Sequence, residues 1–557
     1  MIRCIHCMYI FFLLSAATVS CKKGSDSPQP PTVTETFKLI AATINSNAAT
    51  TQNGLNVLPV IKVAFTAGMD RNTVVDGIVL SQSNGTAVAL NASYQNNDSV
   101  VILQPGTALA FITKYILSVN STLKSKKNTA LSTPAIINFI TQIDSTDKFP
   151  LISDSALLDK VQQQTFKYFW DFGHPVSGMA RERNSSGDVV TTGGTGFGIM
   201  AIVTAVNRKF ISRAEGVTRL LKITNFLTNN CTQYHGAFAH WINGATGATV
   251  PFSTNDDGAD LVETSYLMQG LLTARQYFNM ADVTETDLRN KINVVWNGID
   301  WNWFRQGGRN VLYWHWSANK AWIINARISG WNEALITYVM AAASVNSSIS
   351  KAVYDSGWAR NGAMKNNNTY FGYVLPLGPN VGGPLFFEHY SFLGINPNGL
   401  KDNYADYQTQ TLNHTRINYE YCKANPKQYY GYSNQCWGLT ASDVPNSGYN
   451  ANAPDNDIGV ITPTAAISSL PYTPAESMAA LKFFYYKLGD KMWGDYGFYD
   501  AFSLKDTWFA NSTLAIDQGP EIVMIENYRT GLLWSLFTSC PEVKQGLIRL
   551  GFAAPYL

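Results

Sequence analysis

The sequence predicts a mainly helical protein, an (α/α) toroid with about six inner helices, preceded by a small all-β domain. Between residues 37 and 143 apolar and polar side chains alternate over short stretches, as in strands, whereas a helical period holds from residue 147 to the C-terminus. Long connections precede every second predicted helix, so the inner helices would all begin at one rim. A solenoid of helical hairpins is the competing architecture, but no internal repeat supports it.

The composition is that of a well-packed globular protein with more than one domain. The chain has 557 residues, too many for one core, and 46% of them are hydrophobic against 14% charged. A net charge of +2 gives no electrostatic basis for binding nucleic acid or an anionic membrane. Aromatic residues make up 13% of the chain, and those in loops rich in Gly, Asn and Asp are suited to stacking on sugar rings, although core packing accounts for most of them.

Residues 1–20 have the features of a signal peptide: a positive charge near the start, a short apolar run and small residues before the cleavage site. The run is too short to span a membrane. Val19-Ser20-Cys21 resembles a bacterial lipobox, although Thr18 replaces the usual Leu, and this implies cleavage before Cys21 and lipid attachment to it. A plain secretory signal with an incidental cysteine is the alternative.

Residues 21–36 are predicted to form a flexible tether. We therefore expect an exported, monomeric protein that is lipid-anchored in the bacterial envelope, on the periplasmic side or at the cell surface. Four cysteines follow the tether, and they show neither metal-ligand spacing nor an assignable disulfide; they are Cys231, Cys422, Cys436 and Cys540.

Residues 37–144 are predicted to form a β-sandwich of about a hundred residues. Turn signals such as Asn84-Gly85 separate its alternating stretches. Val63-x-Phe65, followed by Met69-Asp70, resembles the signature of bacterial immunoglobulin-like domains. This domain has no titratable cluster, so we expect it to be a spacer or a packing module.

Residues 150–557 are predicted to form the toroid. The stretch Thr191–Gly196 precedes its first inner helix and is expected to be a flexible turn that permits close approach, because it lacks the Lys and the preceding parallel strand of a phosphate-binding loop. The six inner helices are predicted to start near Phe197, Asp260, Trp331, Pro384, Ile461 and Glu521.

The second predicted inner helix and the residues just before it carry the acidic side chains at the centre of the candidate site. Asp256 and Asp257 can cap it, Asp260 lies at the positive end of its dipole, and Glu263 shares one face with Tyr266. Burying a carboxylate on the inside of a helical array costs free energy unless the group is paired or has a function, which favours a functional role for Glu263. The alternative is that these acids only cap an ordinary core helix. The other rim segments add acids and rings, including Trp314, His315, Trp331, Glu333 and Asp500, which together have the composition of a polysaccharide cleft.

No metal site is predicted. Asp455-Asn456-Asp457 lacks the distal Glu of a calcium loop. The histidines His240, His315 and His389 are scattered, which favours core or substrate-contact roles over zinc. Glu526 and Arg529, three residues apart on a helix, are predicted to form a structural ion pair.

Three motifs resemble the bacterial glucoamylase-like family, which includes the endo-β-1,2-glucanases. They are Leu261-Val262-Glu263-Thr264-Ser265-Tyr266, Ile461-Thr462-Pro463-Thr464 and Ile516-Asp517-Gln518-Gly519-Pro520. The resemblance extends from about residue 151 to the C-terminus. It implies an (α/α)6 barrel and inverting hydrolysis of β-1,2-glucan to sophoro-oligosaccharides, without metal or cofactor.

Within this hypothesis Glu263 is the first choice for a catalytic carboxyl, as the general acid, because an inward helix face near aromatic rings can raise its pKa. Asp188 or Asp455 would activate water, directly or through a substrate hydroxyl. Substrate contacts are assigned to Arg181, Arg183, Trp241, Glu388, His389, Asp457, Tyr499 and Asp517, with Asp457 also a near alternative to Asp455.

The sequence leaves two alternatives to a hydrolase open. A polysaccharide lyase can use the same toroid, but lyases act on acidic sugars through Tyr, His and basic subsites, whereas this rim is rich in carboxylates. A non-catalytic glycan-binding lipoprotein would share the anchor and the aromatic rings but would not need opposed carboxyl groups.

Overall fold

The computed structural model describes residues 36–557. The signal peptide, Cys21 and all but the last residue of the tether lie outside the described residues. Among the residues that are described, no helix is long and apolar enough to cross a membrane.

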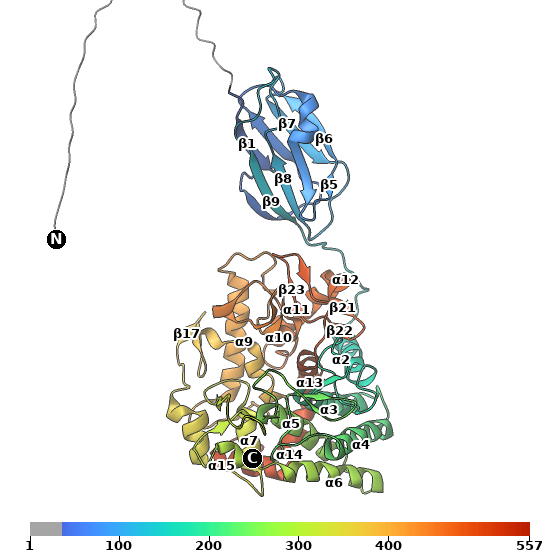
Figure 1. The fold of residues 1–557 in the computed structure, drawn as a ribbon, viewed down its shortest axis with the longest axis vertical. Coiled ribbons are helices and arrows are strands. Elements are labelled where there is room, and N and C mark those ends of the chain that lie inside the picture. Colours follow the sequence, from blue (N-terminus) through green and yellow to red (C-terminus); the bar gives the residue numbers. More distant parts are fainter. Residues whose placement is uncertain (1–35) are drawn as a thin grey trace, which may run out of the picture. The chain divides into compact units, whose positions relative to one another are not determined.

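The all-β domain contains two sheets (Figure 1). Antiparallel neighbours in the first sheet bring Val63 opposite Val101, and Val63 and Leu117 are fully buried. The first sheet has the order β1 (Leu39–Ile44), β3 (Ile61–Phe65), β7 (Val100–Pro105), β6 (Leu90–Gln95). The second has the order β2 (Thr51–Leu55), β9 (Ala135–Thr141), β8 (Lys114–Val119), β4 (Ile78–Gln82), β5 (Ala87–Val88), and the short helix α1 (Val74–Gly77) precedes β4.

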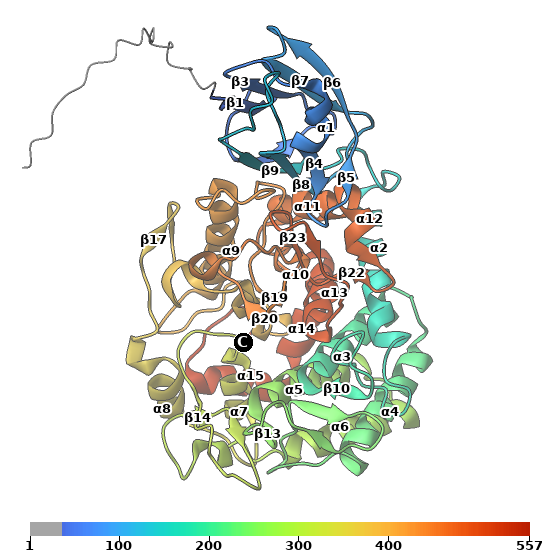
Figure 2. The same cartoon turned by 45° about the horizontal axis from the view of Figure 1, so that its top comes forward.

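The helical domain has an inner ring of helices and an outer ring. The inner elements are α3 (Thr192–Asn207), α5 (Leu261–Tyr277), α7 (Leu335–Ala343), the 3₁₀ turns η6 (Leu385–Glu388) and η7 (Ser391–Leu393), α10 (Pro463–Ile467) and α13 (Ala515–Thr530). The ring closes because α3 packs against both α5 and α13. Figure 2 shows α3, α5, α10 and α13 in the interior of this domain and α4, α6 and α9 at its periphery.

The outer helices alternate with the inner ones along the chain. They are α2 (Asp154–Trp170), α4 (Arg213–Asn229), α6 (Val283–Gly298), α8 (Lys351–Val353) with the π-helical η3 (Tyr354–Trp358), α9 (Tyr407–Ala424), and α11 (Pro474–Lys482) with η9 (Phe483–Lys487) and α12 (Gly489–Met492). The chain ends with α14 (Leu532–Ser539) and α15 (Pro541–Leu550). The predicted fold class, a toroid behind an all-β sandwich, is therefore confirmed.

Short strands form in the loops between the helices, and some of them position the site. They are β10 (Val189–Thr191), β11 (Trp241–Asn243), β12 (Thr249–Val250), β13 (Ala259–Asp260), β14 (Leu312–Tyr313), β15 (His315–Trp316), β16 (Arg327–Ile328), β17 (Thr369–Tyr370), β18 (Tyr373–Val374), β19 (Ala441–Val444), β20 (Gly448–Ala451), β21 (Trp493–Gly494), β22 (Gly497–Phe498), β23 (Phe502–Ser503) and β24 (Trp508–Phe509). Because β10 pairs with β11, and β13 with β15, segments that precede different inner helices are tied together.

Three local expectations are corrected by the structure. The stretch Thr191–Gly196 is not a turn: all but its first residue belong to the buried start of α3. Its glycines do permit close approach, since a Cβ on Gly196 would lie 2.1 Å from the carbonyl oxygen of Tyr266 on α5. The fourth inner segment forms 3₁₀ turns rather than a helix. Helix α13 begins at Ala515 and contains Pro520, so it starts before Glu521, where the sequence predicted its first residue.

Candidate active site

A cavity of about 360 Å³ lies at the rim where α3, α5, α7 and α13 begin. Its walls combine carboxyl groups with aromatic rings. The lining includes Glu182, Arg183, Thr191, His240, Trp241, Phe252, Glu263, Tyr266, Trp314, Glu333, Phe386, Tyr390 and Tyr449. A larger surface groove of about 900 Å³ lies elsewhere, beside α2 and α11, and its charged side chains pair with one another, as Lys482 does with Asp154 at 2.7 Å.

Glu263 is fixed in the first turn of α5. Asp260, the N-cap of this helix, accepts the backbone N–H groups of Val262 at 3.0 Å and Glu263 at 2.9 Å through Oδ1. The Glu263 Oε2 in turn accepts the backbone N–H of Gly193 at 2.7 Å and the hydroxyl of Thr191 at 3.3 Å. Burial raises the pKa of Glu263, and the attraction of His240 and these two hydrogen bonds oppose that rise.

Glu333 is a second carboxyl group in the cavity wall, just before α7. Burial raises the pKa of Glu333 to about 7, and the charges of Asp260 and Glu263 add to the effect. The hydroxyl of Tyr266 donates to the backbone carbonyl of Glu333 at 3.4 Å and so lies beside this segment. The sequence places Glu333 at the rim but gives it no role, because α7 starts without a capping side chain that would mark the residue.

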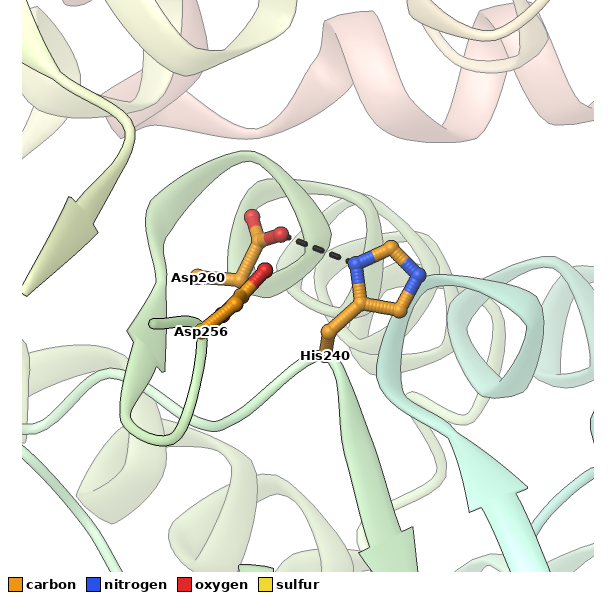
Figure 3. Close-up of side chains that lie close together, drawn as sticks. All are labelled: His240, Asp256 and Asp260. Carbon is orange, nitrogen blue, oxygen red and sulfur yellow. Dashed lines mark hydrogen bonds and ion pairs between the residues drawn. The ribbon is translucent and has the colours of Figure 1, made fainter. Parts of the chain in front are cut away.

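Two histidines and two aspartates surround the start of α5. The Nδ1 of His240 donates to Asp260 Oδ2 at 3.0 Å (Figure 3). The Nε2 of His315 lies 3.3 Å from Asp256 Oδ2 and 3.6 Å from Asp260 Oδ2. Burial lowers the pKa of His240, but Glu263, Asp260 and Asp256 outweigh it and raise that pKa to about 9. The pKa of Asp260 is lowered, because hydrogen bonds from both histidines outweigh its burial.

The same group is where a metal ion could be held. Donor atoms of His240, Asp256 and Asp260 lie within 4.8 Å of one another, the only such set among residues 36–557. Imidazole and carboxylate are ligands that zinc accepts. Of these donors, His240 also contacts Asp260, and both aspartates contact His315.

Another part of the cavity wall is an ion-pair network centred on Arg183. Its Nε lies 2.9 Å from Glu182, and its Nη1 donates to both oxygens of Asp443 at 3.1 Å. Asp500 accepts the backbone N–H of Asp443 at 2.6 Å, and burial together with the charge of Asp443 raises the pKa of Asp500 to about 7. Burial and the neighbouring Asp500 raise the pKa of Asp517 well above its usual range.

Of the residues assigned to the site from sequence, Glu263, Arg183 and Trp241 line the cavity. Asp188 and Asp455 do not line it. The side chain of Asp188 is 63% exposed and contacts His174 Nε2 at 3.2 Å, and Asp455 is exposed on the 3₁₀ turn η8 (Pro454–Asn456).

The remaining residues assigned from sequence make hydrogen bonds or packing contacts with other parts of the fold. Glu388 is fully buried, and its Oε1 accepts from Trp331, Gln410 and His414 at 3.1, 2.8 and 2.8 Å. His389 contacts Ser469 at 3.0 Å, and burial lowers the pKa of His389 to about 3.

Asp457 is buried, and its carboxylate accepts from the hydroxyls of Tyr421 at 3.1 Å and Tyr432 at 2.7 Å. Arg181 stacks over the Phe172 ring at 4.5 Å. Tyr499 packs against buried hydrophobic residues that include Phe498 and Phe502, and Asp517 interacts with Asp500 and Asp443. None of these residues lines the cavity.

An (α/α) toroid that gathers carboxyl groups and aromatic rings in one rim cavity defines a class, the carbohydrate-active toroid enzymes. Residues 325–541 match the family described as "Putative glucoamylase", and residues 29–141 match "Bacterial Ig-like domain". The chain belongs to this glucoamylase-like family, and the resemblance inferred from its motifs is confirmed.

Its relatives are proteins that act on β-1,2-glucans. The chain is 45% identical over 430 residues to the exo β-1,2-glucooligosaccharide sophorohydrolase (non-reducing end) of Parabacteroides distasonis; the match covers 73% of this chain and 59% of that protein. An endo-β-1,2-glucanase from Chitinophaga pinensis, in complex with sophorotriose and glucose, is 50% identical, with a TM-score of 0.71 over 73% of this chain and 100% of the other. A β-1,2-glucanase from Parabacteroides distasonis is 37% identical, with a TM-score of 0.70 over 93% of this chain and 73% of the other.

Proposed function

We propose that the protein is a glycoside hydrolase that cleaves β-1,2-linked glucan to sophoro-oligosaccharides with inversion at the anomeric carbon. The observation that carries this proposal is the presence of two carboxyl groups with raised pKa, Glu263 and Glu333, in one aromatic-lined cavity. The activities of the 45% and 50% identical relatives support the choice of linkage.

Inverting hydrolysis needs one carboxylic acid and one carboxylate. The acid protonates the glycosidic oxygen as the C1–O bond breaks, and the carboxylate takes a proton from the water that attacks C1 from the opposite face. We assign this pair to Glu263 and Glu333, because both line the cavity with a raised pKa. Glu182 also lines it but is paired with Arg183, and Asp188 and Asp455 do not line it. Glu263 thus keeps the essential role expected from the sequence.

The cavity suits a neutral sugar. Trp241, Phe252, Trp314 and Tyr449 offer ring faces for stacking. Arg183 is already bound to Glu182 and Asp443, so it offers no unpaired charge to a uronate. This argues against a lyase, which would need a basic subsite for an acidic sugar.

The test is reducing-end release from linear β-1,2-glucan by the soluble chain that starts after Cys21. Starch, laminarin and an acidic glycan serve as comparison substrates, and Glu263→Gln and Glu333→Gln as variants. We expect activity on β-1,2-glucan alone, lost in both variants. A product that absorbs in the near ultraviolet would instead indicate a lyase, and binding without new reducing ends would indicate a glycan-binding protein.

The same proposal includes export and anchoring of a monomer through a lipid on Cys21, which the lipobox-like Val19-Ser20-Cys21 supports. Mass spectrometry of the membrane fraction of expressing cells should then find a diacylglyceryl group on Cys21. The Cys21→Ala variant should accumulate as an uncleaved precursor. A mature chain that begins at another residue and carries no lipid would contradict anchoring.

A further inference from the structure

Three tryptophans form a partly exposed aromatic surface in the loop between α6 and α7. Trp303 belongs to the 3₁₀ turn η2 (Trp303–Arg305), Trp316 belongs to β15, and Trp322 follows β15. The ring centroid of Trp303 lies 6.0 Å from that of Trp316 and 6.5 Å from that of Trp322. Trp303 is 39% exposed, and the other two are partly exposed. We call these three residues the tryptophan platform; contiguous exposed apolar surface of this kind is typical of a binding site.

The platform continues the wall of the cavity. Trp314 lines the cavity, and Trp316 follows it by two residues, a span of at most about 7 Å. The pairing of β13 with β15 also places Trp316 opposite Ala259, the residue before the N-cap of α5. A ligand that leaves the cavity past Trp314 therefore meets the platform next.

The ring of Trp303 is held in place before any ligand binds. His235 stacks on it at a centroid distance of 3.7 Å, and His235 has a left-handed backbone φ of 52°, which is uncommon for a residue other than Gly. The carbonyl of His235 accepts the backbone N–H of Asp300 at 2.9 Å, and the carboxylate of Asp300 accepts the backbone N–H of Trp303 at 3.1 Å. A ring fixed in this way loses little conformational entropy on binding.

The charges of this loop are bound to other groups of the fold. The Nε of Arg305 donates to the carbonyl of Arg309 at 2.8 Å, and Arg309 donates to the hydroxyl of Tyr313 at 2.9 Å. The Nζ of Lys320 lies 3.4 Å from the carboxylate of Asp257. The platform thus presents ring faces rather than charge, which suits an uncharged ligand with an apolar face, such as a glucose unit.

The size of the cavity requires a polymeric substrate to continue outside it. Its volume of about 360 Å³ is near the lower end of the ~300–1,000 Å³ typical of sites for small molecules. A long glucan chain that is bound there must therefore run on over the neighbouring surface.

We propose that the tryptophan platform is a distal subsite, on which sugars of a β-glucan chain outside the cavity stack against Trp303, Trp316 and Trp322. The inference rests on the proposed hydrolase function and adds to it that long chains bind more tightly than short oligosaccharides.

The test compares long linear β-1,2-glucan with sophorotriose for the variants Trp303→Ala, Trp322→Ala and Trp303→Phe. Titration calorimetry gives Kd in chains that also carry Glu333→Gln, so that the ligand stays intact, and steady-state assays without Glu333→Gln give kcat and KM. Each Ala variant should raise Kd and KM for the long glucan roughly fivefold, the scale of one lost stacking contact, with kcat unchanged. Sophorotriose binding should not change, and Trp303→Phe should keep most of the affinity.

The matched control is Phe371→Ala, which removes a ring that is 45% exposed between β17 and β18, outside the platform. This variant should bind both ligands as the wild type does. Unchanged affinity for the long glucan in both Ala variants would overturn the proposal. An equal loss for sophorotriose would also overturn it, because that result indicates a structural role.

Two further outcomes separate this inference from its alternatives. If light scattering showed a wild-type dimer that Trp303→Ala dissociates, the surface would be a contact between copies of the chain, and the proposal would fail. Hydrolysis of β-1,2-glucan with no effect of the platform variants would refute the platform alone. Platform-dependent binding of the glucan by a wild-type chain that releases no reducing ends would refute the hydrolase alone, and a chain that neither binds nor cleaves it would refute both.

Discussion

At the residue scale the site depends on a glycine as much as on its acids. A Cβ on Gly193 would lie 2.6 Å from Oε2 of Glu263 and 2.9 Å from the ring of Tyr266. A real Cβ contact at 2.6 Å does not occur, so any side chain at this position must displace the carboxyl group that Gly193 also binds through its N–H.

We therefore expect Gly193→Ala to lower kcat on β-1,2-glucan at least about tenfold, the cost of a small misplacement of a catalytic group. The matched control is Gly298→Ala, at the end of α6, where an added Cβ meets nothing within 4 Å. The control should keep wild-type kcat. Equal rates in the two variants would show that the contact between Gly193 and Glu263 is not needed.

Glu333 should lower stability in the pH range where it ionises. Its pKa is raised from 4.5 to about 7, so the folded state holds this proton more tightly than the unfolded chain does. The stabilising contribution is fully present below pH 4.5 and is lost as the pH rises through about 7. Glu333→Gln cannot ionise, so its Tm should exceed that of the wild type by about 2 °C at pH 8 while activity is lost. Scanning calorimetry at pH 5 and pH 8 checks this, and a Tm gain that is larger at pH 5 than at pH 8 would contradict it.

The sequence could assign a role to Glu263 but not to Glu333, although it places Glu333 at the rim. Glu263 follows Asp260 at capping distance and shares a helical face with Tyr266, so periodicity marks it. Glu333 lies before a helix without a side-chain cap, and no local pattern tells whether its carboxyl reaches a cavity. Glu388 and Asp457, which the sequence assigns to substrate contact, are hydrogen-bonded inside the fold instead.

At the scale of elements, the packing of α3 between α5 and α13 fixes the rim. Residues Thr192–Val206 of α3 are all buried, so this helix is apolar around its whole circumference. Its C-terminal end is tied to α13 by an ion pair, because Nε of Arg208 lies 2.6 Å from Oε2 of the fully buried Glu526. The sequence predicted instead a pair between Glu526 and Arg529, and that is wrong: Arg529 binds Asp159 on α2 at 2.5 Å.

Glu526→Gln should therefore destabilise the fold by about 3 kcal/mol, because it leaves Arg208 partly buried without its counter-charge. Activity per folded molecule should change little, since Glu526 does not line the cavity. Glu420→Gln, which removes an exposed pair with Lys423, is the matched control and should leave the denaturation midpoint unchanged. Urea denaturation measures both, and similar midpoints for the two variants would rule out the structural role.

The order of elements was more predictable than their form. Long loops before every second helix indicated the inner ring, because loops that meet at one rim must all lie on the same side of the toroid. The forms of η6, η7 and the short α10 were not predictable, since tertiary packing in a crowded inner ring overrides local helical propensity. The helical start of α3 was hidden by its glycines, which sequence rules place in turns.

At the scale of the whole molecule, the chain joins an Ig-like domain to a helical toroid. Relatives solved without the Ig-like part match 73% of this chain over their own full length, so the toroid is a folding unit in this family. The residues lining the cavity all belong to the toroid. A fragment of residues 150–557 should therefore keep kcat/KM on β-1,2-glucan within about twofold of the chain that starts after Cys21. Steady-state assays on both proteins test this, and a fragment that is folded by circular dichroism but inactive would contradict it.

The most direct test of inverting hydrolysis by Glu263 and Glu333 is time-resolved ¹H NMR of β-1,2-glucan during hydrolysis. Inversion by a separated acid and base requires that the first new reducing ends are α-anomers, and we expect Glu263→Gln and Glu333→Gln to produce none. In that mechanism the two carboxyl groups leave room for water at a separation of about 6.5 to 9.5 Å. A first product that is the β-anomer, or continued hydrolysis by either variant, would contradict the assignment of Glu263 and Glu333 as the catalytic pair.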